Sequence, residues 1–175
     1  WNLRGGTYAE AIERFADRGI MVYGSFVFGY DHDSPEVFDR TAEFAVESKL
    51  FLVNFSALTP TPGTPLYDRL KREGRLLNDP WWLDPGYRYG QATFRPARMT
   101  PDELTEGCLR ARRQFFSYGS IARRALDPRA NARGLARLGI FAAANLLTRR
   151  ELGNKLGRRL GTDAPLVPFV EGACD

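Results

Sequence analysis

The sequence predicts an α/β fold in which helices connect parallel strands. Helix-like and strand-like segments alternate over residues 7–72, in the order helix, strand, helix, strand, helix, and this alternation is typical of parallel strands joined by right-handed crossovers. Only two strong strand patterns occur, and two parallel strands can neither close a barrel nor cover their own edges. Either a partner supplies further strands, or the chain is the second half of a larger domain. The absence of a starting Met favours the second alternative.

The first four elements follow from periodicity and end signals. Helical spacing of apolar residues predicts a helix from Thr7 to Arg18, ended by Gly19. The next segment, "IMVYGSFVFGY", has the continuous apolar pattern of a strand buried on both faces. Ser34 as N-cap and Pro35 at the first helical position predict a second helix. The segment "LFLVNFSAL" then predicts the second strand.

The stretch "LTPTPGTPLYDRL" (58–70) predicts a rigid corner between the second strand and a third helix. Its three prolines fix their own φ angles and bias the residues before them toward extended geometry. Gly63 can adopt a positive φ, and Thr64 with Pro65 has the chemistry of a helix start. In α/β folds such corners carry binding sites.

Beyond Gly74 the sequence becomes turn-rich and aromatic, with one short strand expected from Tyr89 to Phe94. A capping box at Thr100 and Glu103 begins a helix along "TPDELTEGCLRARRQFFSYGSIARRAL". Its expected core face comprises Leu104, Cys108, Ala111 and Phe115. A further helix is expected from about Asn131 to Lys155, followed by an extended tail.

Composition sets broad limits on function. The 175 residues are 43% hydrophobic and 26% charged, which is ordinary for one globular domain. The longest apolar stretch, "LGIFAAANLL" (138–147), is too short to span a bilayer. Cys108 and Cys174 fit neither a disulfide framework nor a metal motif, so a reducing cytoplasm is the simplest setting.

The net charge of +4 conceals a strongly basic region. Residues 110–160 hold thirteen basic and two acidic residues, and the remaining residues hold twelve basic and nineteen acidic ones. We rank intramolecular docking or solvation of these arginines first, contact with a membrane surface second and nucleic-acid binding third. The arginines considered are Arg110, Arg112, Arg113, Arg123, Arg124, Arg149, Arg150, Arg158 and Arg159.

Ligands of parallel α/β folds bind at the carboxyl ends of strands, here "FVFGYDHDSPE" and "SALTPTPGTPLY". Gly29 there allows either close approach of a flat ligand or an ordinary turn. The cluster of Asp31, His32 and Asp33 contains suitable metal ligands, but adjacent turn residues seldom point at one centre, so a capping and loop-closing role is preferred. Cys108 is interpreted as a core residue. The aromatic residues Trp81, Trp82, Tyr87 and Tyr89 fit a packed loop slightly better than a substrate pocket.

The motifs "GSFVFGYDHDSPEVF" and "LTPTPGTPLYDRLKREGRL" together resemble the second half of radical S-adenosylmethionine enzymes, most closely the subgroup with an N-terminal cobalamin-binding domain. "DPWWLDPGYRYG" and "MTPDELTEG" resemble the C-terminal extension of one branch. The resemblance covers residues 1–157. It implies the last two strands of a partial (β/α)6 barrel over residues 1–75, an aromatic loop region over 76–99, a basic, mainly helical extension over 100–160 and a tail over 161–175.

The resemblance also implies a cofactor site. In this family the backbone at the two strand ends contacts the adenosyl group, which corresponds here to Phe28, Gly29, Tyr30, Leu58, Thr59 and Pro60. Such enzymes reductively cleave S-adenosylmethionine to a 5′-deoxyadenosyl radical, which abstracts a substrate hydrogen. The subgroup adds cobalamin as a candidate cofactor and methyl transfer as a candidate reaction, and the basic helices suggest an apolar or lipid-like substrate.

One departure from the family pattern is large. The CxxxCxxC motif that would bind an iron–sulfur cluster is absent, and Cys108 and Cys174 cannot replace it. The cluster is therefore expected on a missing N-terminal part, without which the chain is expected to be inactive. The alternative function is a non-catalytic module whose basic helices bind anionic membrane or nucleic acid.

Overall fold

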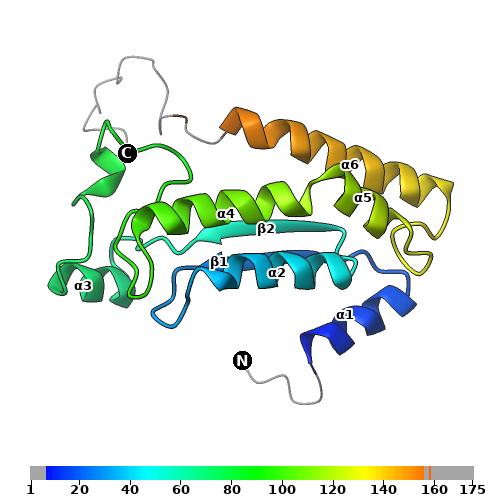
Figure 1. Cartoon of the computed structure of the whole chain (residues 1–175), viewed down its shortest axis with the longest axis horizontal. Helices are drawn as coiled ribbons and strands as arrows, with labels where there is room; N and C mark the ends of the chain where they lie inside the picture. Colours follow the sequence, from blue (N-terminus) through cyan, green and yellow to red (C-terminus); the bar gives the residue numbers. More distant parts are fainter. Residues whose placement is uncertain (1–6, 156–157, 159–175) are drawn as a thin grey trace, which may run out of the picture.

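The computed structural model describes residues 7–155 and 158, and shows a mixed α/β fold (Figure 1). Within them, two parallel strands accompany six α-helices and one short 3-10 helix. In chain order the elements are α1 (Tyr8–Asp17), β1 (Tyr23–Phe28), α2 (Glu36–Glu47), β2 (Leu52–Ala57), α3 (Pro65–Arg72), η1 (Trp81–Leu83), α4 (Pro101–Phe115), α5 (Tyr118–Ala125) and α6 (Leu135–Lys155). The predicted tail over 161–175, with Cys174, and Arg159 lie outside the described residues.

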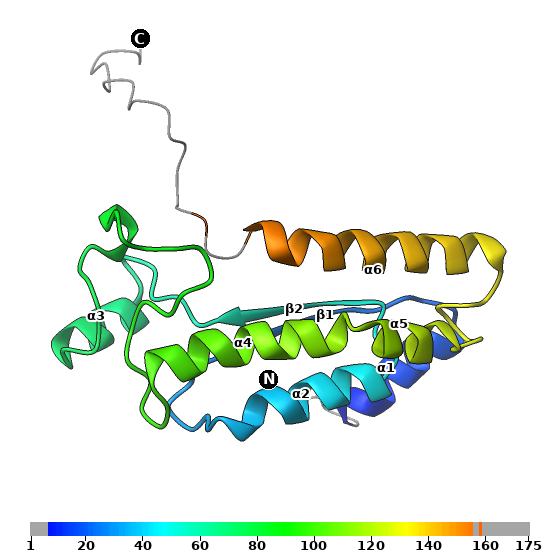
Figure 2. The ribbon, with the colours of Figure 1, turned by 45° about the horizontal axis from the view of Figure 1, so that its top comes forward.

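The core lies between the sheet and the helices α2 and α4. The strands pair in parallel register, from Tyr23 opposite Leu52 to Phe28 opposite Ala57. Phe28 and Phe55 turn to this side and pack against Phe38 of α2 and Phe115 of α4, with ring centroids 4.8 and 6.1 Å apart respectively. Figures 1 and 2 show α4 and α2 running alongside the two strands. The long helix after the aromatic loop therefore belongs to the same core as the strands.

The opposite face of β1 is not buried by the described residues. Tyr23, Ser25 and Val27 are exposed along this face, and they alternate with the inward-facing side chains. The expectation of a strand buried on both faces is therefore wrong for this chain. One face of β1 packs against the core. The apolar residues Tyr23 and Val27 lie on the other face and are exposed.

Side chains from the basic region close the outer edge of β2. In the parallel register the carbonyl of Phe55 points away from β1, and Phe51 immediately precedes β2. Arg112 Nε donates to the carbonyl of Phe55 at 2.7 Å, and Asn145 Nδ2 donates to that of Phe51 at 3.1 Å. Arg124 donates to the same Phe51 carbonyl at 3.1 Å. Intramolecular docking, ranked first from the sequence, is confirmed for these two arginines.

Several boundaries differ from the sequence expectations. The segment after Thr100 forms two helices, because Ser117 caps a new helix by accepting from the Ser120 amide. The last helix begins at Leu135, whereas Asn131 is buried ahead of it and bonds the carbonyls of Lys49 and Arg124. The expected strand near residues 89–94 is a single bridge between Leu76 and Phe94.

The start of α2 is also corrected. Pro35 is the N-cap without a side-chain cap bond, and the Ser34 hydroxyl donates to the Glu36 carboxylate instead. The predicted caps at Thr64 and Thr100 are confirmed, and Thr7 caps α1 at its predicted start. In the part of the chain that the structure describes, no helix combines the length and apolar character needed to cross a bilayer.

Candidate site at the carboxyl ends of the parallel strands

The structure brings the two predicted strand ends together. The amide of Leu58 donates to the carbonyl of Phe28 at 2.7 Å, which places residues 28–30 beside residues 58–60. Tyr30 and Thr59 are exposed at this edge, Leu58 is half-buried, and the other three predicted residues, Phe28, Gly29 and Pro60, are buried. The role of these six residues in cofactor binding stays a prediction. Of the six, mainly Tyr30 and Thr59 are accessible to a ligand from solvent.

Gly29 has a structural reason to be glycine. Its φ of +104° is a conformation that residues with a side chain rarely adopt. A Cβ at this position would lie 3.0 Å from Leu104 Cδ2 and 3.2 Å from Phe94 Cζ. The glycine therefore permits close packing of α4 against the end of β1, which favours the turn interpretation of this residue.

Asp33 closes the loop after β1, as the sequence predicts. Its buried carboxylate accepts hydrogen bonds from the amides of Gly29 and Tyr30 at 2.9 and 3.0 Å. These two amides are consequently engaged within the protein. The backbone at the first strand end is held in place before any ligand arrives.

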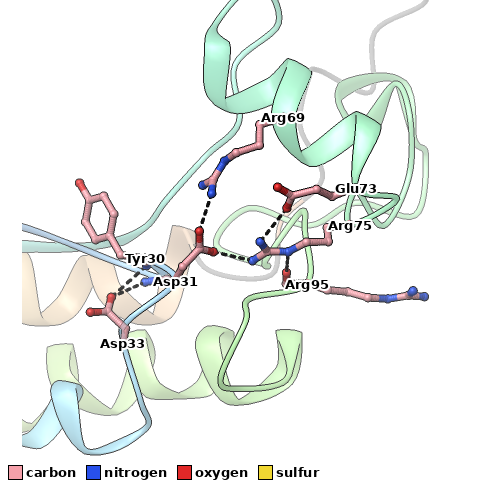
Figure 3. Close-up of polar contacts among 8 residues, drawn as sticks. Tyr30, Asp31, Asp33, Arg69, Glu73, Arg75 and Arg95 are labelled. Carbon is pink, nitrogen blue, oxygen red and sulfur yellow. Dashed lines mark hydrogen bonds and ion pairs between the residues drawn. The ribbon is translucent and has the colours of Figure 1, made fainter.

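Asp31 connects the same loop to the corner (Figure 3). Its carboxylate accepts from Arg69 at 2.5 Å and from Arg75 at 2.9 Å. Arg75 also pairs with Glu73 at 3.0 Å and donates to the carbonyl of Arg95 at 2.8 Å. Hydrogen bonds from Arg69 and then Arg75 hold the pKa of Asp31 below its usual value of 3.8. The network ties the end of β1 to α3 and to the segment before α4.

We predict that Asp31→Asn lowers stability at neutral pH, because two arginines lose their charged acceptor. The folded-state pKa lies below the unfolded one, so the stabilising contribution is present above about pH 4 and is lost as pH falls through the folded pKa. Urea unfolding of wild type and variant from pH 7 to pH 2 measures this difference. Glu106→Gln, which alters an exposed carboxylate of α4, is the control. A gap between wild type and Asp31→Asn that persists unchanged at pH 2 would contradict the prediction.

No metal site accompanies the acidic loop. The ring of His32 stacks on that of Tyr30, with centroids 5.7 Å apart and an interplanar angle of 10°. Among residues 7–155 and 158, no group of three His, Cys, Asp or Glu side chains could hold a metal ion. Cys108 is buried on α4, and burial raises the pKa of its thiol to about 12. Cys108 is therefore a core residue, as the sequence predicts, and its thiol is protonated near neutral pH.

The aromatic loop docks onto the corner. Trp81 Nε1 donates to the carbonyl of Pro60 at 3.1 Å, and the Trp81 ring lies 5.2 Å from that of Tyr87. The Tyr67 hydroxyl of α3 donates to Asp79, which also pairs with Lys71 at 2.8 Å. Trp81 therefore packs the loop against the second strand end, which supports the packing interpretation for this residue.

Two cavities lie along β2, one at its carboxyl end and one beside its first residues, and they share Tyr89 and Arg112. One, of about 120 Å³, is lined by Ser56, Ala57 and Thr59 of the second strand end. The other, of about 210 Å³, lies beside Leu52 and Asn54 under α6. Its further lining residues are Tyr23, Val53, Phe116, Thr148, Glu151 and Leu152.

Arg112 was not identified as a site residue from the sequence. It stands one helical turn after the buried Cys108, which places it at the border of the core face of α4. From this position alone, Arg112 could have been predicted to be less exposed than the neighbouring Arg113.

Comparison with known proteins identifies relatives, and no family model matches the chain. Bacteriochlorophyllide d C-12(1)-methyltransferase of Chlorobaculum tepidum is 28% identical over 117 residues, which is 67% of this chain and 25% of the relative. Hopanoid C-2 methylase of Rhodopseudomonas palustris is 37% identical over 70 residues, 40% of this chain and 13% of the relative. Anaerobic magnesium-protoporphyrin IX monomethyl ester cyclase of Cereibacter sphaeroides is 26% identical over 107 residues, 61% of this chain and 17% of the relative.

The chain spans a quarter or less of the length of these curated relatives. All three are enzymes, and two of them are named as methylating enzymes. They confirm the resemblance found in the strand-end and corner motifs. The chain is thus similar to radical S-adenosylmethionine enzymes of the kind that has a cobalamin-binding domain.

Proposed function

We propose that this chain is the C-terminal part of a radical S-adenosylmethionine methyltransferase that also uses cobalamin. The observation that carries the proposal is its likeness to methyltransferases of which it matches a quarter or less. It would contribute part of the adenosyl and substrate pocket and depend on an N-terminal part, or a cobalamin-binding domain, for activity.

The strands β1 and β2 would be the last two of a partial (β/α)6 barrel. Three features support this assignment. Within the described residues β1 pairs only with β2, which leaves its other edge available for a preceding strand. The far edge of β2 is closed by Arg112, Arg124 and Asn145, as suits a terminal strand. The exposed face of β1 would then face the barrel interior, opposite the helices.

The described residues do not fit an iron–sulfur cluster. They include one cysteine, Cys108, whose buried thiol is protonated near neutral pH, whereas cluster ligands are thiolates. We therefore assign the cluster to the N-terminal part. The strand ends fit S-adenosylmethionine better, because the stacked rings of Tyr30 and His32 offer an exposed flat surface and Thr59 lines a cavity.

An apolar or lipid-like substrate is proposed for the intact enzyme. The relatives are named for bacteriochlorophyllide d, a hopanoid and magnesium-protoporphyrin IX monomethyl ester, which are large ring systems with extensive apolar surface. The cavity of about 210 Å³ presents Leu52, Phe116 and Leu152 together with the charged residues Arg112 and Glu151. This mixture suits an apolar body that carries a polar substituent.

The cofactor assignment is tested by adding bulk at the second strand end. In the intact, cluster-loaded protein, Thr59→Trp is expected to weaken binding of S-adenosylmethionine about tenfold, because the indole would fill the cavity that Thr59 lines. Thr61→Trp is the matched control, since Thr61 is also exposed and also precedes a proline. Equilibrium dialysis measures the affinity, and formation of 5′-deoxyadenosine provides a second measurement. Equal affinities for the two variants would contradict the assignment.

A further inference from the structure

The helix α6 presents a continuous apolar face that no described residue covers. Leu135, Ile140 and Leu147 are 90%, 55% and 61% exposed. At 3.6 residues per turn, the exposed positions of this helix fall within about 160° of its circumference. Among residues 135–152 these positions are Leu135, Ala136, Gly139, Ile140, Ala143, Leu146, Leu147, Arg150 and Glu151, of which only Arg150 and Glu151, near the end of the helix, are charged.

The opposite face fixes the orientation of the helix. Phe141 is fully buried and packs 6.1 Å from Phe51 between ring centroids. Asn145 is also fully buried, donates to the Phe51 carbonyl at 3.1 Å and accepts from Arg124 at 2.9 Å. The helix therefore cannot turn its apolar face inward without breaking these contacts. Figure 2 shows α6 along the outside of the molecule, with the strands on its inner side.

Arginines border the apolar face on both sides. Arg137 lies along one border and donates to the carbonyl of Gly19. Arg149 lies along the other, where it donates to the carbonyl of Phe116 at 2.8 Å and covers the ring of Tyr118, which is itself 67% exposed. Arg133 and Arg150 are exposed near the two ends of the helix.

Acidic residues are scarce in this part of the chain. Between residues 110 and 155 they are Asp127, which is buried, and Glu151. An apolar face with basic borders and an interfacial tyrosine matches the chemistry of a lipid surface that carries anionic headgroups. A protein partner would instead need a complementary acidic rim around an apolar groove.

We propose that α6 lies flat on an anionic membrane surface. Its leucines and Ile140 enter the boundary between headgroups and acyl chains, and the bordering arginines contact lipid phosphates. The same placement orients the cavity under α6 close to the bilayer. This inference rests on the exposed face of α6 and not on the cofactor or the reaction of the enzyme.

The test is co-sedimentation of the intact protein with lipid vesicles. Vesicles of phosphatidylcholine with phosphatidylglycerol are expected to bind the protein, and phosphatidylcholine alone to bind it far less. Binding is expected to weaken as salt is raised, because the arginine contribution is screened. The double variant Leu146→Glu/Leu147→Glu is expected to bind about tenfold more weakly. Both positions are exposed, so the variant should retain its unfolding midpoint.

The matched control is Tyr8→Glu, which adds a carboxylate at an exposed residue of α1, on the other side of the molecule (Figure 1). It is expected to bind like wild type. Equal binding by the double variant and wild type would overturn the proposal, as would binding to neutral vesicles that salt does not affect. A wild type that ignores vesicles but forms a dimer lost in the double variant would identify a second copy of the chain as the occupant, and would equally overturn it.

Discussion

Replacing Arg124 with methionine is expected to lower the free energy of unfolding by about 3–5 kcal/mol, because it leaves buried acceptors without a donor. The side chain of Arg124 is fully buried, although it lies in the most basic region of the sequence. A loss of this size is a large fraction of the total stability of a typical domain, which is about 5–15 kcal/mol.

The expected loss follows from the hydrogen bonds of the guanidinium. A guanidinium carries five N–H groups, and five acceptors surround this one at distances from 2.9 to 3.3 Å. The acceptors are Ser120 Oγ, the carbonyls of Leu50, Phe51 and Phe115, and Asn145 Oδ1. The guanidinium carbon also lies 3.6 Å from the centre of the Phe115 ring. Arg124 thus joins α4, α5, α6 and the start of β2.

Arg123→Met is the matched control, because Arg123 precedes Arg124 on the same helix and is exposed. Its expected effect is within about 0.5 kcal/mol. Arg124→Lys should also be destabilised, since an ammonium cannot reach the fork of acceptors that the planar guanidinium bonds. Burial lowers the pKa of Arg124 to about 9, so the group stays charged at pH 7. Chemical denaturation of the three variants at pH 7 measures the differences, and similar values for Arg123→Met and Arg124→Met would contradict this role.

The helix starts were predictable because their chemistry is local. Thr7, Thr64 and Thr100 each accept a hydrogen bond from an amide three residues later, and Glu10 and Glu103 complete capping boxes. All the groups involved lie within three residues of one another along the chain. The same reasoning failed at Ser34, where a neighbouring carboxylate, Glu36, takes the hydroxyl.

The buried polar residues were not predictable in the same way. Arg124 was grouped with arginines expected to dock intramolecularly or stay solvated, with no partner named, and Asn145 was part of an apolar run. The two nevertheless bond each other across 21 residues of chain. Their backbone partners, Leu50 and Phe51, immediately precede β2 and lie more than 70 residues away in the chain. A weak signal existed, because Arg124 follows Ser120 and Ile121 on the buried side of α5.

The candidate site was predictable in position and less so in detail. Parallel strands place their carboxyl ends at one edge, so the juxtaposition of residues 28–30 and 58–60 followed from the topology. The requirement for glycine at position 29 could not be predicted from the topology, because Leu104, which packs against it, lies on a helix 75 residues later in the chain. Arg112 was missed because its contribution depends on the edge of β2 that it closes.

Gly107→Ala is expected to destabilise the protein by about 1–3 kcal/mol through overpacking. Gly107 is buried in the middle of α4, where a Cβ would overlap the ring of Phe38 on α2. Phe38 is itself fully buried and packs 4.8 Å from Phe28 between ring centroids, so its ring has no space to retreat. The close crossing of these two helices, which holds the strand ends in place, therefore requires glycine.

Gly139→Ala in α6 isolates this packing effect from helix propensity. No atom lies within 4 Å of a Cβ at Gly139, so the substitution should stabilise the protein by about 0.5–1 kcal/mol, as expected for glycine to alanine in a helix interior. The two substitutions are chemically identical, and thermal and urea unfolding should give changes of opposite sign. If Gly107→Ala instead stabilised the protein as Gly139→Ala does, α2 and α4 would have to be further apart than the structure places them. The packing of α4 against the strand ends would then also be less close.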